Sequence, residues 1–461
     1  MELDWLKRPN IFFLIFLFIF VRVPMLFLGF GLDPDAWRVA NSAFDLRYHF
    51  VYHTSRFPGY PLPEFIDSLL INFGWTATNS LTMLLSLLSV LTFAYLLKEN
   101  KTSNKGLLTV TYAFTPLLLI NSTNSMDYMW GLSFVIFSWY FIVRRRFIIG
   151  GIMMGLAVSA RPQVTLFLIP FVFLLGRSDV RKRHIIQFVL ASLVISIIAF
   201  MPVYMTYGFG FIHHYPPRTT WLQTGYGAIK HFGLPGLVVL ILIGVTSLKG
   251  FRVMMFKPTK NDLFILLSLI IAFLSFAVTP YHFEYLIPMI PFGLVFISRV
   301  AKKPLLILFC CFVLLHGFLT FASIQHAGEG HISIRAVDDG AVIKNITARR
   351  KQIADATKIT EADVAAHSVI LVGPWLPMIA YLGNDISSTE GTKKLYDSNI
   401  QEQGVWNFRH QLWYRYLIDL DELTLLLSNN FGAYYVNGVR EYTREIYGYD
   451  LNDHGAILLE L

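Results

Sequence analysis

The sequence predicts a mainly helical fold, in which a polytopic membrane bundle is followed by a C-terminal α/β domain outside the membrane. Hydrophobic residues make up 55% of the 461 residues and charged residues only 15%, whereas a soluble domain carries about 25% charged residues. Residues 1–324 hold 26 Lys or Arg and 12 Asp or Glu. Residues 325–461 hold 12 Lys or Arg and 18 Asp or Glu. We therefore expect a membrane part, 1–324, and an acidic extracytoplasmic domain, 325–461. Because the cations lie among apolar segments and the soluble part is acidic, nucleic-acid binding is excluded.

Apolar segments long enough to cross a membrane recur along the first two thirds of the chain. A hydrocarbon core about 30 Å thick needs about 20 apolar residues in a helix. On this criterion eleven spans are expected, near 11–30, 76–97, 106–121, 128–143, 147–160, 163–176, 185–206, 234–248, 262–279, 284–298 and 304–323. The fifth and sixth are short and are separated by Arg161-Pro162. The adjacent Cys310 and Cys311 lie inside the last span, so they do not form a disulfide framework.

The distribution of cations gives the orientation of these spans. Alternate loops hold 19 Lys and Arg residues, and the opposite loops hold six. Cytoplasmic loops carry the excess of cations, so the N-terminus is expected inside and the tail outside. The outer loops also carry acids and histidines, which exchange protons or bind metals near neutral pH. Any chemistry is therefore expected on the outer face.

The first outer loop, about 31–75, is expected to be structured. Asp33-Pro34 is typical of a helix start, and a helix is predicted from Pro34 to about Leu46. A turn is expected at 57–61. The apolar spacing in 62–70 predicts an amphipathic helix that lies in the membrane interface.

Asp33 and Asp35 directly follow the first span and are the leading candidates for chemistry. Two carboxylates at this spacing can hold a divalent cation such as Mg²⁺ or Mn²⁺, although the sequence does not require one. One of them can instead take a proton from an acceptor hydroxyl. The alternative is structural, because Asp33 is a good helix cap and Asp35 complements the helix dipole.

Arginines on the outer face are candidates for binding a phosphate, because the guanidinium fork matches phosphate oxygens. They are Arg56, Arg161 and Arg218. The alternative for each is a loop arginine at the level of the lipid headgroups. Arg22 lies within the first span, where it meets a lipid phosphate or pairs with a neighbouring helix.

Histidines and one glutamate complete the outer candidates. His49 and His53 are four residues apart, which aligns two zinc ligands on a helix, but no third ligand has a fixed spacing. The segment Tyr281-His282-Phe283-Glu284 stands at the outer mouth of a late span. A glutamate there needs a role or a partner, and the alternative is stabilisation by the helix dipole.

The tail is expected to form a small α/β domain. Residues 336–357 are predicted to be helical, and 369–372, 433–436 and 456–459 are predicted strands of a partly parallel sheet. A phosphate loop, a nucleophile elbow and metal-ligand spacing are all absent from its sequence. We therefore interpret the tail as a support or acceptor-recognition module.

Three motifs together resemble those of the GT-C superfamily of membrane glycosyltransferases. Asp33-Pro34-Asp35 is similar to the acidic motif of the first loop in that superfamily. The segment 56–61, Arg-Phe-Pro-Gly-Tyr-Pro, is similar to the Arg/Pro/Gly-rich turn of many bacterial and archaeal members. His282-Phe283-Glu284-Tyr285 resembles the His-Lys-Glu-rich motif of lipid-linked mannosyltransferases, although Phe283 replaces the lysine and the arginine expected next is missing.

The resemblance implies an inverting hexosyltransferase, such as a mannosyltransferase, that uses a polyprenyl-phosphate sugar on the outer or lumenal face. The acceptor is then a lipid, a glycan or a protein, and the membrane is the plasma membrane or the endoplasmic reticulum. The implied roles are a general base for Asp33 or Asp35, donor-phosphate binding for Arg56, Arg161 and Arg218, and sugar or acceptor binding for His53, Tyr281, His282 and Glu284.

Two other functions stay open at the level of the sequence. A transporter or lipid flippase is compatible with eleven spans, but internal repeats are not visible and the ionisable residues gather on the outer surface. A non-catalytic assembly subunit would use the acidic tail for docking.

Overall fold

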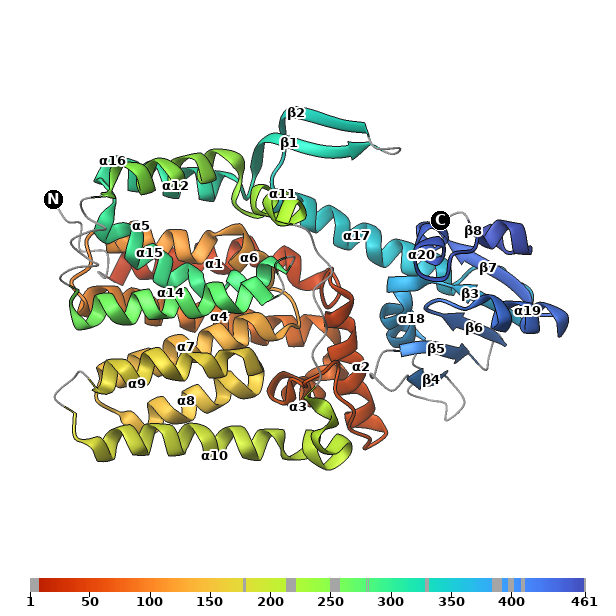
Figure 1. Cartoon of the computed structure of the whole chain (residues 1–461), viewed down its shortest axis with the longest axis horizontal. Coiled ribbons are helices and arrows are strands. Elements are labelled where there is room, and N and C mark those ends of the chain that lie inside the picture. Colours follow the sequence, from red (N-terminus) through yellow and green to blue (C-terminus); the bar gives the residue numbers. More distant parts are fainter. Residues whose placement is uncertain are drawn as a thin grey trace.

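The computed structural model describes residues 8–176, 180–212, 221–248, 258–278, 280, 282–327, 331–383, 392–396, 402–407 and 411–459. Long apolar helices run side by side in one bundle, and an α/β domain lies at one end of it (Figure 1). The bundle helices are α1 (Arg8–Arg22), α4 (Gly74–Glu99), α5 (Lys105–Phe114), α6 (Pro116–Asn121), α7 (Asp127–Val143), α8 (Phe147–Ala160), α9 (Leu168–Gly176), α10 (Lys182–Tyr207), α12 (Leu234–Thr246), α14 (Lys260–Val278), α15 (Met289–Val300) and α16 (Lys303–Leu315).

The outside of the bundle is apolar, as expected for an integral membrane protein. Phe12, Phe16 and Phe20 on α1 are each more than 60% exposed, and so is Ile197 on α10. Exposed apolar surface of this extent marks contact with lipid or protein. In the described part of the chain, four helical stretches are long and apolar enough to span a membrane: 10–27, 61–99, 182–210 and 260–278. Six shorter apolar helices accompany them. The total of eleven spans and the orientation stay predictions.

The last predicted span, 304–323, is wrong beyond residue 315. The helix α16 ends at Leu315, and β1 (Leu319–Ala327) pairs antiparallel with β2 (His331–Asp339). Apolar content alone does not separate a helix from a strand, and Thr320-Phe321 favours a strand. The predicted helix 336–357 likewise begins later, at Ala341, because its first residues belong to β2.

Two helices lie across the bundle end that faces the α/β domain (Figure 1). They are α2 (Pro34–Tyr48) and α3 (Pro61–Leu70), which pack on each other. Both predicted helices of the first loop are thus confirmed. A further helix, α11 (Trp221–Phe232), precedes α12 and has no counterpart among the predicted segments.

The α/β domain contains a six-stranded mixed sheet, which confirms the partly parallel sheet. Its strand order is β4-β5-β6-β3-β7-β8, and β3 pairs parallel with both β6 and β7. The elements are β3 (Ser368–Leu371), β4 (Thr392–Tyr396), β5 (Glu402–Asn407), β6 (Leu412–Arg415), β7 (Gly432–Val436), β8 (Ile457–Leu459), α17 (Ala341–Thr360), α18 (Leu376–Leu382), α19 (Leu420–Ser428) and α20 (Val439–Tyr447). Val369, Ile370 and Leu371 are fully buried, as a central strand covered on both faces requires.

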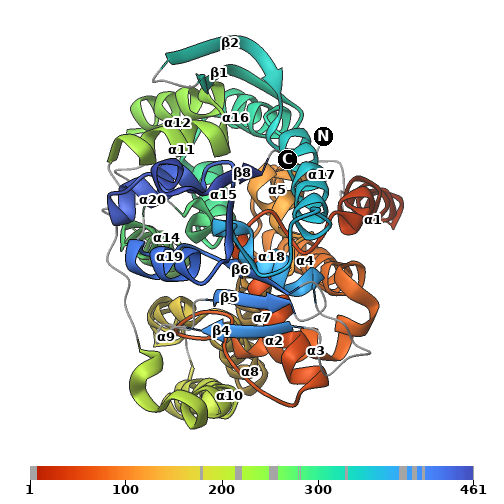
Figure 2. The same ribbon diagram turned by 90° about the vertical axis from the view of Figure 1, so that its right-hand side faces the viewer.

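The α/β domain contacts the bundle through two helices. The helix α18 packs against α2, and α17 contacts α6. Figure 2 shows the α/β domain in front of this end of the bundle. Asn41 of α2 donates a hydrogen bond to the carbonyl of Pro377 at 2.8 Å. Phe30, Trp37 and Tyr381 pack edge to face across the same junction. The first loop of the bundle is therefore enclosed by the domain that ends the chain.

Candidate functional site

The segment 28–32, which leads to the acidic pair, is fixed by buried hydrogen bonds. Arg349 of α17 is fully buried and donates to the carbonyls of Leu28 and Gly29, both at 2.8 Å. Asn79 of α4 donates to the Gly29 carbonyl from the opposite side, also at 2.8 Å. Gly29 has φ of +73°, and a Cβ there would meet the Trp37 ring at 2.9 Å. Glycine is required because the chain turns in the left-handed region against a packed indole.

Asp33 caps α2, as one of its two predicted roles required. Its Oδ1 accepts a hydrogen bond from the backbone N–H of Asp35 at 2.9 Å. Burial, together with the negative charge of Asp35, raises the pKa of Asp33 to about 7. The capping bond and the positive charge of Arg56 oppose this shift but do not cancel it. Asp33 therefore changes protonation state near neutral pH.

Asp35 is held between two guanidinium groups. Its Oδ1 lies 2.6 Å from Nη1 of Arg38, one helical turn later, and its Oδ2 lies 3.1 Å from Nε of Arg56. Burial alone would raise the pKa of Asp35, but the charges of Arg56 and Arg38 outweigh burial and the pKa is lowered. The two neighbouring carboxyls consequently differ in proton affinity, which is typical of acid and base sites.

Arg56 connects this pair to a second acid, Asp127. Nη2 of Arg56 lies 2.6 Å from Oδ1 of Asp127, and Oδ2 of Asp127 pairs with Nη1 of Arg161. Asp127 begins α7 and is fully buried, and Arg161 lies between α8 and the short 3-10 helix Pro162–Phe167. The break between these two helices at Arg161-Pro162 therefore places the Arg161 guanidinium beside Asp127. We refer to Asp33, Asp35, Arg38, Arg56, Asp127 and Arg161 as the carboxylate–arginine cluster.

Arg56 and Arg161 each carry a guanidinium nitrogen that is buried without a hydrogen-bond partner among the described residues. These nitrogens are Nη1 of Arg56 and Nη2 of Arg161. An aromatic ring faces each of these side chains. The ring centre of Tyr60 lies 3.9 Å from Cζ of Arg56, and the ring centre of Tyr285 lies 4.4 Å from Cζ of Arg161. A buried N–H that lacks an acceptor costs free energy, so each nitrogen is suited to an anionic ligand oxygen.

The segment His282–Leu286 joins the cluster from the bundle end before α15. Burial, reinforced by the charges of Arg161 and Arg56, lowers the pKa of His282 to about 4 although the charge of Asp35 opposes it. Burial raises the pKa of Glu284. Phe283, which stands where the resembling motif has lysine, stacks on His231 with ring centres 4.9 Å apart. The segment therefore offers a neutral imidazole and a carboxyl group of raised pKa rather than a cation.

Other predicted site residues are placed differently. Nε2 of His53 lies 2.6 Å from Oδ2 of Asp45, whose Oδ1 contacts His49 at 3.1 Å, so His53 is paired within the loop after α2. Arg22 donates to the hydroxyl of Ser122 at 2.6 Å, so it pairs with a neighbouring helix, one of the two predicted alternatives. The predicted residues Arg218 and Tyr281 lie outside the described residues.

Asp127 and Arg38 were not assigned a site role from the sequence. Asp127 is one of the acids of the outer loops. It also begins an apolar helix, where an acid is commonly found because it complements the helix dipole, so its position alone does not indicate a site. Its partners, Arg56 and Arg161, lie 71 and 34 residues away along the chain. Only the packing of α7 against α8 and the first loop brings them together.

The described residues do not form a metal centre. Among them, His, Cys, Asp and Glu make no group of three or more that could hold a metal ion. Asp35 already contacts two arginines, and Asp33 already accepts a backbone N–H. The donor set therefore does not fit the cation considered between the two carboxylates, and no step below uses one.

Comparison with protein families matches part of the membrane bundle. A family model described as GPI transamidase subunit PIG-U matches residues 71–235. This segment contains Asp127 and Arg161 but not Asp33, Asp35 or Arg56. None of the curated proteins compared with the chain matches it significantly.

Solved structures show the fold. ArnT from Cupriavidus metallidurans bound to undecaprenyl phosphate matches with a TM-score of 0.51 at 13% identity, over 78% of this chain and 82% of that one. The apo oligosaccharyltransferase of Archaeoglobus fulgidus matches with a TM-score of 0.51 at 11% identity, over 82% of this chain. This chain spans 64% of that oligosaccharyltransferase and 59% of an apo ArnT chain, which matches with a TM-score of 0.44 at 16% identity. The bundle thus has the GT-C fold, as the motifs predicted.

Proposed function

From this GT-C fold and its carboxylate–arginine cluster, we propose that the chain is an integral-membrane glycosyltransferase. It moves a sugar from a polyprenyl-phosphate donor to an acceptor hydroxyl, with inversion at the anomeric carbon. The observation that carries the proposal is a pair of buried nitrogens, on Arg56 and Arg161, that have no hydrogen-bond partner among the described residues. They lie beside two carboxyls whose pKa values are shifted in opposite directions. The ArnT structure bound to undecaprenyl phosphate supports the choice of donor, because it has the same fold.

Asp33 is the general base in this proposal. The acceptor O–H bond breaks towards the Asp33 carboxylate while the acceptor oxygen bonds to the anomeric carbon. The bond from that carbon to the donor phosphate breaks, and its electron pair stays on the polyprenyl phosphate. A base with a pKa near the working pH is the most effective, and Asp33 satisfies this condition better than Asp35.

Arg56 and Arg161 stabilise the departing phosphate. Asp35 and Asp127 hold Nε and Nη2 of Arg56, and Asp127 holds Nη1 of Arg161. Nη1 of Arg56 and Nη2 of Arg161 have no hydrogen-bond partner among the described residues and can donate to the phosphate. Donors fixed before the reaction act on developing charge without reorganising, which is the basis of electrostatic catalysis. Asp35 positions Arg56 in this account, and His282 and Glu284 contact the sugar.

The test is sugar transfer in proteoliposomes, with a polyprenyl-phosphate mannose as donor and an alkyl mannoside as acceptor. Loss of a general base lowers the rate by about 10²- to 10⁴-fold, and we expect this from Asp33→Asn. Asp363→Asn, on an exposed loop of the α/β domain, is the matched control and keeps full activity. Full activity of Asp33→Asn would remove Asp33 from the mechanism.

A second candidate is a non-catalytic subunit of a membrane complex that handles lipid-linked glycans. The match of residues 71–235 to the PIG-U family favours it, since that family is described as a subunit. The matched segment begins after both first-loop carboxylates, so the two candidates differ in what they require of Asp33. A subunit would bind a lipid-linked glycan equally well with Asp33→Asn and would transfer no sugar in either form.

A further inference from the structure

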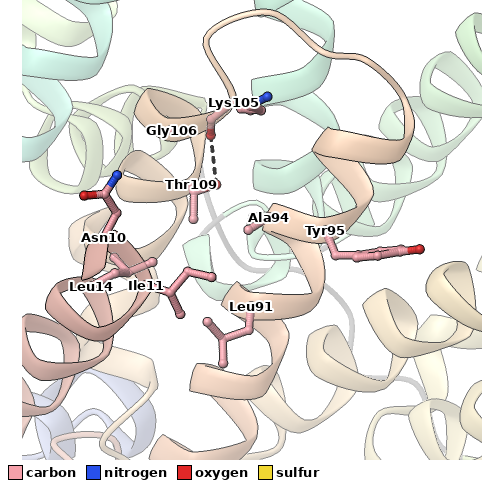
Figure 3. A pocket seen from close by; sticks show the side chains of 9 residues that line it. All are labelled: Asn10, Ile11, Leu14, Leu91, Ala94, Tyr95, Lys105, Gly106 and Thr109. Carbon is pink, nitrogen blue, oxygen red and sulfur yellow. Dashed lines mark hydrogen bonds between the residues drawn. The ribbon is translucent and has the colours of Figure 1, made fainter. Parts of the chain in front are cut away.

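A pocket opens between α1, α4 and α5 at the bundle end away from the carboxylate–arginine cluster (Figure 3). The start of α4 packs at the cluster's end, where Thr78 contacts Ser125, and the pocket lies near the other end of α4. Its volume is about 280 Å³. It is lined by Asn10, Ile11, Leu14, Leu91, Ala94, Tyr95, Lys105, Gly106 and Thr109.

The floor of the pocket is buried and apolar. Leu14 is 5% exposed and Ala94 is 8% exposed. Thr109 adds a hydroxyl, but that hydroxyl donates to the carbonyl of Lys105 at 2.8 Å, as Figure 3 shows. The floor therefore suits an apolar occupant, because removing apolar surface from water is favourable.

The rim of the pocket is basic. Lys105 lies at its mouth with its ammonium group turned away from the apolar residues (Figure 3). Lys98 and Glu99 end α4, Lys101 lies in the connection, and Lys105 begins α5, so three cations stand against one acid there. Basic pockets between membrane helices bind anionic lipid headgroups.

We infer that this pocket binds one acyl chain of an anionic phospholipid, with the headgroup held by Lys105 and the neighbouring lysines. The lining helices lie within the membrane bundle, so acyl chains are the apolar groups that reach the opening. Ligand pockets start at about 300 Å³, so the volume suits part of one chain rather than a whole lipid. The site is independent of the carboxylate–arginine cluster and of the proposed sugar transfer.

The experiment is native mass spectrometry of the delipidated full chain, titrated with phosphatidylglycerol or with phosphatidylcholine of the same chain length. Wild type is expected to bind phosphatidylglycerol at least tenfold more tightly than phosphatidylcholine. Ala94→Phe fills the pocket and should lose that binding, and Lys105→Gln should lose the preference between the two lipids. Leu88→Phe, at a 43% exposed position of the same helix, is the control and should behave as wild type.

The headgroup site and the acyl-chain pocket are tested by different outcomes. Equal binding of both lipids by wild type would overturn the anionic headgroup site, and unchanged binding in Ala94→Phe would overturn the pocket. Leu91→Trp reduces the space inside the pocket and provides the same test if Ala94→Phe does not fold. Glycerol phosphate should not compete; competition would show a phosphate site without a lipid chain and would contradict the inference.

Discussion

Arg56 links the two acidic parts of the cluster through separate nitrogens. Nε contacts Asp35, Nη2 contacts Asp127, and Nη1 is buried without a hydrogen-bond partner in the part of the chain that the structure describes. A planar fork of this kind serves several acceptors at fixed angles, which a lysine ammonium does not. The same side chain can therefore be anchored by the protein and still present a donor to a phosphate.

The pKa of Asp33 gives a pH prediction. A base acts when it is deprotonated, so transfer should rise as the pH increases through about 7 and level off above it. Asp35→Asn removes a negative charge that raises the pKa of Asp33, so the midpoint of the profile should move to lower pH. The measurement is the initial rate of sugar transfer by wild type and by Asp35→Asn, at pH values from roughly 5 to 9. A midpoint that stays in place in Asp35→Asn would contradict the assignment.

At the scale of residues, the sequence predicted the members of the cluster better than their contacts. Asp33, Asp35, Arg56 and Arg161 carry recognisable signals, namely a loop position, a resembling motif or a proline break. Their convergence on Asp127 depends on tertiary packing across separate helices, which a single sequence does not display. His53 was grouped with them because it precedes Arg56, but its ring turns to Asp45.

At the scale of elements, α17 holds the start of the first loop, residues 28–32, through side-chain hydrogen bonds. Arg349 on this helix hydrogen-bonds the carbonyls of Leu28 and Gly29 and the side chain of Asn124, and Gln352 donates to the carbonyl of Leu32 at 2.9 Å. The loop that precedes Asp33 is thus held by a helix more than 300 positions later in the chain. Positioning by rigid elements is what a catalytic carboxylate requires.

Arg349→Ala should release this loop. Buried acceptors left unpaired cost about 1–3 kcal/mol each, so hydrogen exchange within 26–35 should accelerate by about 30-fold or more. Hydrogen-exchange mass spectrometry makes the comparison, with the exposed neighbour Arg350→Ala as the matched control. Equal protection of 26–35 in the two variants would show that α17 does not hold the loop.

Elements were predicted well where a capping or turn signal marks their ends. Asp33-Pro34 marks the start of α2, and Gly373-Pro374 follows β3, so both elements were placed close to their observed bounds. The error at 304–323 arose where an apolar run continues without a break from α16 into β1. There the strand β1 forms because it pairs with β2, and this pairing cannot be predicted from the hydropathy of the sequence.

At the scale of the whole molecule, the cluster and the α/β domain share one end of the bundle, and the cation-rich loop between α4 and α5 lies at the other (Figure 1). The positive-inside rule assigns the cluster's end to the outside. Single cysteines at Asp363 and at Lys101, in a chain whose Cys310 and Cys311 are replaced, test this in intact cells. A membrane-impermeant maleimide should label position 363 and should reach position 101 only after permeabilisation. The reverse pattern would invert the topology.

Recognition of a polyprenyl phosphate by the two arginines is tested most directly by binding of undecaprenyl phosphate to the purified chain. We expect wild type to bind it, and Arg56→Ala and Arg161→Ala to weaken binding by about tenfold or more, because each removes a charge-assisted hydrogen bond. Arg350→Ala should bind as wild type does. Equal affinity in all four proteins would contradict the phosphate site, and with it the glycosyltransferase built around it.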